Sequence, residues 1–153
     1  MIQEQKELLL KDLCARLPYE VIIHYHWERK GTIVDVVDED RKLDFSDVES
    51  LKYILIEMQD NQFIIEWKPY LRPMSSMTKE ELYEVQGILG KGVEIREGFL
   101  LSVYSSINSF TYLELQAVFD WLNAHHFDHR GLIPMGLAIE VTEENNPYKK
   151  LKI

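Results

Sequence analysis

Two short runs rich in β-branched and aromatic residues, separated by a four-residue turn, constrain the fold of this chain most. The runs are residues 21–27 and 32–37, and the turn between them, residues 28–31, ends in Gly31. Valine, isoleucine, tyrosine and tryptophan favour extended backbone, and glycine tolerates the conformations that a tight turn requires. The pattern therefore predicts a β-hairpin.

Stretches with helical periodicity lie on both sides of this hairpin. Residues 3–16 repeat leucine at helical spacing and precede Pro18, which ends the helix. A capping box of Thr78 and Glu81 begins a second helix, and residues 110–125 form a third. Strands are predicted at residues 93–96 and 99–104. The order of these elements predicts an α+β fold, with about three helices packed on a mainly antiparallel sheet of short strands.

The segment after the hairpin is open to two interpretations. Residues 38–40 are all acidic and are expected to form a turn, with a short strand at residues 42–45. Residues 46–58 fit a helical stripe, but residues 52–67 fit a second hairpin equally well. We favour the hairpin.

Length, charge and cysteine content exclude several classes of protein. A chain of 153 residues predicts one globular domain, with an end that frays from about residue 143. The net charge of −9 argues against binding to nucleic acid. Cys14, the only cysteine, excludes an internal disulfide and is expected to be a small apolar residue of the first helix. Apolar runs are too short to cross a membrane, no secretory signal is visible, and we expect a cytoplasmic protein without a cofactor.

A segment braced by two prolines is the strongest candidate for a binding loop. Residues 68–77 contain Pro69 and Pro73, which remove backbone donors, so a central strand is not expected there. Aromatic and methionine side chains on a stiff loop can anchor a protein partner. The alternative, which we favour, is that the segment only packs across the sheet. The candidate binding residues are Trp67, Tyr70, Leu71, Arg72, Met74 and Met77.

Histidines supply the candidates for catalysis and metal binding. His24 and His26 are two apart on a predicted strand, so they point to one face and could hold one metal ion. His126, Asp128 and His129 occupy three positions of a metal motif of the metallo-β-lactamases, but Ala124 stands at its first ligand position. Histidines at a helix end also complement the helix dipole, and this simpler interpretation is favoured.

Residues 68–78 and 121–138, with the helix end at residues 11–18, resemble an uncharacterised family of small proteins from gut anaerobic bacteria and their phage or prophage elements. The resemblance implies a bacterial or phage cytoplasmic setting and supplies no catalytic residues. We further expect the proline-braced segment and the turn at residues 126–130 to pack together, with Arg72 and Asp128 as an ion pair.

Three hypotheses of function follow. The leading one is a non-enzymatic interaction or accessory protein, in the setting that the resemblance implies, that binds another protein. The second is a small hydrolase or metal-dependent enzyme that uses the histidines and Asp128. The third is mimicry of nucleic-acid charge by the acidic residues 35–49. Oligomeric state does not follow from the sequence.

Overall fold

The computed structural model describes residues 2–31, 36–51, 62–89, 93–96, 99–102 and 112–151. The chain forms two compact units, which we describe separately. Unit 1 comprises residues 1–71 and 130–153, and unit 2 comprises residues 72–129. The expectation of a single domain stays a prediction.

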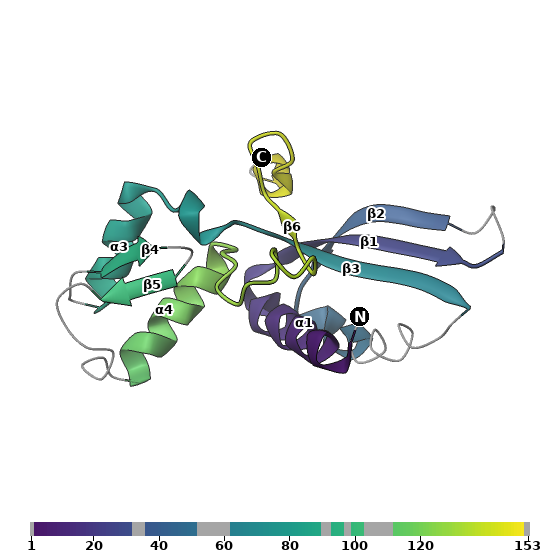
Figure 1. The fold of residues 1–153 in the computed structure, drawn as a ribbon, viewed down its shortest axis with the longest axis horizontal. Helices are drawn as coiled ribbons and strands as arrows, with labels where there is room; N and C mark the ends of the chain where they lie inside the picture. The colour runs from purple at the N-terminus through teal and green to yellow at the C-terminus, as the bar shows by residue number, and fades with distance from the viewer. Residues whose placement is uncertain are drawn as a thin grey trace. The chain divides into compact units, whose positions relative to one another are not determined.

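Unit 1 combines one long helix with a four-stranded sheet in the order β2-β1-β3-β6, and the helix α1 lies along one face of the strands (Figure 1). The predicted α+β class with a mainly antiparallel sheet is confirmed, because among the strand pairs of the described residues only β3–β6 is parallel. The elements of unit 1 are α1 (Gln3–Arg16), η1 (Leu17–Tyr19), β1 (Val21–Arg29), β2 (Val36–Leu43), η2 (Phe45–Asp47), β3 (Phe63–Leu71), β6 (Ile139–Glu140) and η5 (Pro147–Leu151).

The first helix and the first hairpin agree with the sequence analysis, but the hairpin is longer than predicted. β1 pairs with β2 from Val21↔Leu43 to Glu28↔Val36. The acidic residues 38–40 therefore lie inside β2, and the turn predicted for them is wrong. Their carboxylates are tolerated because they lie opposite histidine and tyrosine on an exposed strand pair, where tertiary pairing outweighs low strand propensity.

Pro69 lies inside β3, between β1 and β6, so the sequence argument against a central strand here is also wrong. The main-chain N–H of Lys30 donates to the carbonyl of Gln62 at 2.9 Å, which fixes these two as a hydrogen-bonded pair. The alternation of an antiparallel ladder makes Ile23↔Pro69 a pair without hydrogen bonds. The Pro69 nitrogen therefore points away from β1, and β6 begins to pair only at Tyr70. No hydrogen bond is lost.

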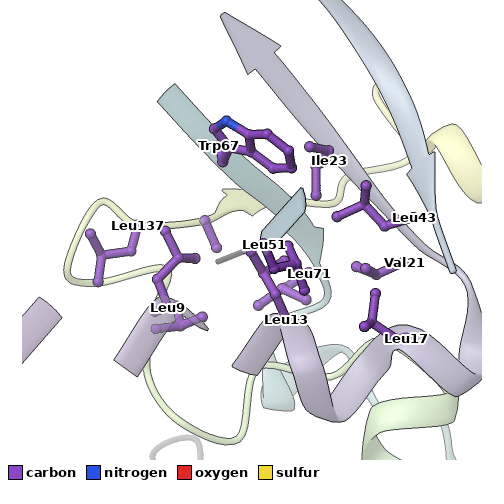
Figure 2. Close-up of a cluster of buried hydrophobic side chains, with 12 residues drawn as sticks. Leu9, Leu13, Leu17, Val21, Ile23, Leu43, Leu51, Trp67, Leu71 and Leu137 are labelled. Atoms are coloured by element: carbon purple, nitrogen blue, oxygen red, sulfur yellow. The ribbon is translucent and has the colours of Figure 1, made fainter. Parts of the chain in front are cut away.

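The core of unit 1 forms between α1 and one face of the sheet, as Figure 2 shows for its best-buried side chains. Beside it, the buried carboxylate of Asp12 accepts two hydrogen bonds from Arg16, at 2.8 and 3.0 Å, and one from Arg130 at 2.9 Å. Helical spacing of four residues brings Asp12 and Arg16 together. The core contains Leu9, Leu13, Leu17, Val21, Ile23, Leu43, Leu51, Trp67, Leu71, Leu132, Leu137 and Ala138.

Unit 2 joins two helices and a small hairpin. Its elements are η3 (Met74–Ser76), α3 (Lys79–Leu89), β4 (Val93–Arg96), β5 (Phe99–Ser102) and α4 (Tyr112–Ala124). The predicted capping box is present, because Glu81 N–H donates to the Thr78 hydroxyl and Thr78 N–H donates to the Glu81 carboxylate, both at 3.1 Å. The core of unit 2 contains Met74, Val85, Val118, Leu122 and Phe127.

Two further segments differ from expectation. Cys14 is exposed on α1, because the buried positions of this helix are Leu9, Asp12, Leu13 and Arg16. The chain beyond residue 143, expected to fray, forms η5 and places the Tyr148 hydroxyl between two strands of the sheet. Residues 48–51 are helical, and the remaining residues of the ambiguous segment, 52–61, lie outside the described part. In the described residues, every helix is too short or too polar to span a bilayer.

Candidate functional site

The sheet of unit 1 has one buried and one exposed face, and the exposed face carries a cluster of titratable side chains. Residues alternate between the two faces of a strand, so those two apart share a face. Val21 and Ile23 face the core, whereas the intervening and following positions of β1 place His24 and His26 on the other side. We call this other side the open face. Its polar residues are His24, His26, Glu28, Asp38, Asp40, Lys42, Glu66, Lys68 and Tyr70.

His24 lies between two carboxylates of β2. Its Nε2 is 2.5 Å from Asp38 Oδ1, and its Nδ1 is 3.0 Å from Asp40 Oδ1. Both ring nitrogens of His24 therefore face a carboxylate oxygen of β2. His24 and Asp40 are opposite residues of a pair without main-chain hydrogen bonds, where side chains come closest. The imidazole is therefore held in place by both neighbours.

Tyr70 of β3 completes this cluster from the other side of β1. Its hydroxyl donates to Asp40 Oδ1 at 2.9 Å, so Asp40 joins the tyrosine to the histidine. Burial, then the hydrogen bond to Asp40 and the charges of Asp40 and Asp38, raise the pKa of Tyr70 to about 12. Tyr70 is thus a neutral hydrogen-bond donor at ordinary pH.

His26 occupies a second, looser arrangement on the same face. Its Nε2 is 3.0 Å from Glu28 Oε2, and its Nδ1 is 3.9 Å from Asp38 Oδ1. Within the described residues no three His, Cys, Asp or Glu side chains are arranged to hold a metal ion. His24 and His26, the candidate metal pair, share a face as expected, and their nitrogens are engaged by carboxylates as hydrogen-bond partners.

The second group of predicted residues lies at the turn after α4 in unit 2, where its contacts are structural. His129 Nε2 is 2.8 Å from the Asn123 side-chain oxygen. Asp128 is buried, and its main-chain N–H donates to the Arg72 carbonyl at 2.8 Å. His126 adopts a left-handed backbone conformation, with φ of 63°, that reverses the chain after the helix. The structure thus brings His126, Asp128 and His129 into one turn, without a metal cluster in the described residues.

Arg72 joins this turn to the proline-braced segment. Its main-chain N–H donates to the His126 carbonyl at 2.7 Å, so the segment and the turn pack together as expected. The predicted ion pair between Arg72 and Asp128 is wrong, because both guanidinium NH2 groups of Arg72 contact Glu81 at 2.7 Å. The guanidinium also lies 4.1 Å from the centre of the Phe127 ring. The proline-braced segment and the turn are therefore in contact through hydrogen bonds of the main chain.

The candidate binding residues separate into buried and accessible ones. Trp67 and Leu71 belong to the core of unit 1, and Met74 belongs to that of unit 2. These three side chains are largely buried among the residues of the two cores. Tyr70, Arg72 and Met77 are half-buried. Of this set, Tyr70 lies on the open face beside His24.

The sequence analysis missed Asp38 and Asp40 as partners of His24, because it placed them in a turn. Extending the alternation of residues 32–37 through residue 43 would have put both carboxylates opposite the histidines. It also missed the buried Asp12–Arg16 pair, although a spacing of four residues between opposite charges was visible. The Arg130 contribution is 118 positions away and has no local signal.

Comparisons of the chain with protein-family models, with curated proteins and with solved structures found no match.

Proposed function

We propose that this chain is a non-enzymatic interaction protein and that the open face of unit 1 binds a protein partner. The observation that carries the proposal is the position of His24, held by Asp38 and Asp40, with Tyr70 bonded to the same Asp40. These side chains are partly exposed and already fixed by one another. A partner that contacts them does not have to order them, which lowers the entropic cost of binding.

The charges of the open face favour a partner segment that carries lysine or arginine. Four carboxylates stand on this face against two lysines. One of the lysines, Lys42, is paired with Glu20 at 3.1 Å, and the other, Lys68, lies 4.0 Å from Glu66. The face is therefore acidic, and complementary charge gives specificity and faster association. The same acidity opposes a phosphate backbone.

The setting that we propose is the cytoplasm of a bacterium, with the chain as an accessory protein of a phage or another mobile element. Support comes from the resemblance carried by residues 68–78 and 121–138 and from the single cysteine.

Photo-crosslinking tests this proposal. A photoreactive residue at Lys68 is expected to capture a defined polypeptide in cells that make this protein, and the Asp38→Lys/Asp40→Lys variant is expected to lose it. The matched control is Glu143→Lys/Glu144→Lys, which makes the same charge change at exposed positions of unit 1. Capture that persists in the first variant, or an absence of any specific product, would overturn the proposal.

A further inference from the structure

A pocket of about 210 Å³ lies at the outer edge of β3 in unit 1, where it shares Glu66 and Lys68 with the open face. It is lined by Gln5 of α1, by three consecutive residues of β3 and by Gly136 and Leu137 of the loop before β6. The middle one of the three strand residues is Trp67. Because side chains alternate, the pocket reaches the core side of the strand through Trp67 and the open face through its neighbours.

The indole nitrogen of Trp67 is a buried donor without an acceptor among the described residues. Trp67 is 8% exposed, and its Nε1 makes no hydrogen bond there. Figure 2 shows the nitrogen on the side of the ring turned away from Ile23. A buried N–H without a partner is unfavourable, and this donor belongs to a residue that lines a pocket. A ligand with an acceptor oxygen would satisfy the Trp67 indole N–H.

The main chain at the same residue offers a second set of groups. Trp67↔Tyr25 is a pair without main-chain hydrogen bonds, by the alternation that the Lys30–Gln62 bond fixes. The N–H and C=O of Trp67 therefore point away from β1, toward the pocket side. In the described residues, β3 is paired on that side only at Tyr70 and Leu71. An N–H and a C=O at an open strand edge match the C=O and N–H of an extended peptide.

We propose that this pocket binds an extended peptide segment, which adds to the edge of β3 at Trp67 and places a carbonyl or carboxylate oxygen on the indole N–H. Two independent features carry the assignment, namely the unsatisfied buried donor and the direction of the main-chain groups beside it. Lys68 and Gln5 add donors at the rim, whereas Glu66 disfavours a bare anion. The chemistry thus fits an amide-bearing chain better than a free inorganic ion. This inference does not rest on the function proposed for the open face.

The test is an NMR titration with a capped Val-Thr-Val tripeptide, observed at the indole N–H resonances of the three tryptophans. We expect the Trp67 resonance to shift and those of Trp27 and Trp121 to stay. The same tripeptide methylated at every amide nitrogen is expected to bind about tenfold more weakly, since it cannot donate to the Trp67 carbonyl. Equal binding of both tripeptides, or no shift at Trp67, would overturn the inference.

Two variants test the assignment, one at a core residue and one at the rim of the pocket. Trp67→Phe removes the donor and keeps an aromatic ring, and it should weaken tripeptide binding about tenfold. Gln5→Phe fills the rim from the surface of α1 without changing the core, and it should also reduce binding. Trp27→Phe is the matched control, because Trp27 lies on β1 and does not line the pocket. Binding that is unchanged in both Trp67→Phe and Gln5→Phe contradicts the assignment.

Discussion

The Tyr148 hydroxyl donates a hydrogen bond of 2.7 Å to the main-chain carbonyl of Tyr70. The same hydroxyl accepts one of 3.2 Å from the main-chain N–H of Ile22. The last regular pair of the β1–β3 ladder is Ile23↔Pro69, and Ile22 and Tyr70 occupy the next position along the two strands. The Tyr148 side chain of η5 thus bridges the two strands at this position and satisfies two main-chain groups.

Replacing Tyr148 with phenylalanine should therefore destabilise unit 1. The variant leaves the Ile22 N–H and the Tyr70 carbonyl without their partner, at a cost of about 1–3 kcal/mol. Urea unfolding measures the change in free energy of unfolding. Tyr83→Phe is the matched control, because Tyr83 is 70% exposed, and it should change stability by less than about 0.5 kcal/mol. Equal stability of the two variants would show that the Tyr148 hydroxyl does not support the ladder.

The buried carboxylate of Asp12 predicts a larger effect. Asp12→Ala leaves the fully buried Arg16 guanidinium without its carboxylate, which typically costs about 3–5 kcal/mol. Arg130→Ala should cost less, because Asp12 keeps both of its hydrogen bonds from Arg16 in this variant. The Arg130 side chain is also 19% exposed, so its own pairing with Asp12 is weakened by solvent. Thermal unfolding of both variants measures the order of these effects. Lys11→Ala, at an exposed position of the same helix, controls for changes in helix propensity.

The Arg72–Glu81 pair should make the stability of unit 2 depend on pH. Burial raises the pKa of Glu81, but hydrogen bonds from Arg72 and Thr78 outweigh it, so the net pKa is lowered from its ordinary value of 4.5. The stabilisation is therefore complete above pH 4.5 and is lost as the pH falls through the lowered value. Because the pair is partly exposed, it contributes less than about 1 kcal/mol.

Glu81→Gln isolates this contribution. Glutamine keeps the capping box with Thr78 but cannot pair with Arg72 as an ion. Its free energy of unfolding should fall less than that of the wild type between about pH 6 and about pH 3. Glu80→Gln, at the exposed neighbouring position, should follow the wild-type curve. Parallel curves for Glu81→Gln and the wild type would argue against the ion pair as the cause.

The contact between Tyr70 and Asp40 is open to direct titration. In the wild type, the Tyr70 phenol should ionise near pH 12, and in Asp40→Asn its pKa should fall toward the ordinary value of 10.0 while staying above it. The remaining elevation is due to burial and to the charge of Asp38, which the variant does not change. Selective ¹³C labelling of tyrosine, followed by NMR, measures both values. Glu39→Gln, on the same strand but the other face, should leave the Tyr70 pKa unchanged.

Local patterns predicted most of the elements and fewer of their contacts. The helix at residues 3–16, the capping box of α3 and the strand at residues 93–96 follow from short-range spacing, and each is present. The length of β2 was underestimated, because three successive carboxylates look like a turn when the opposite strand is unknown. The ion-pair partner predicted for Arg72 was also wrong. The guanidinium extends to Glu81 of α3, and the turn after α4 is held by main-chain hydrogen bonds instead.

The sequence by itself therefore determined the α+β class, the bounds of the first helix and the sharing of one strand face by His24 and His26, because these depend on periodicity over a few residues. Only the tertiary structure decided that Asp38 and Asp40 hold His24 and that Pro69 fits inside a strand. It also decided that Tyr148 completes the ladder. Strand register and long-range packing set these contacts, and neither leaves a signal within a short window of sequence.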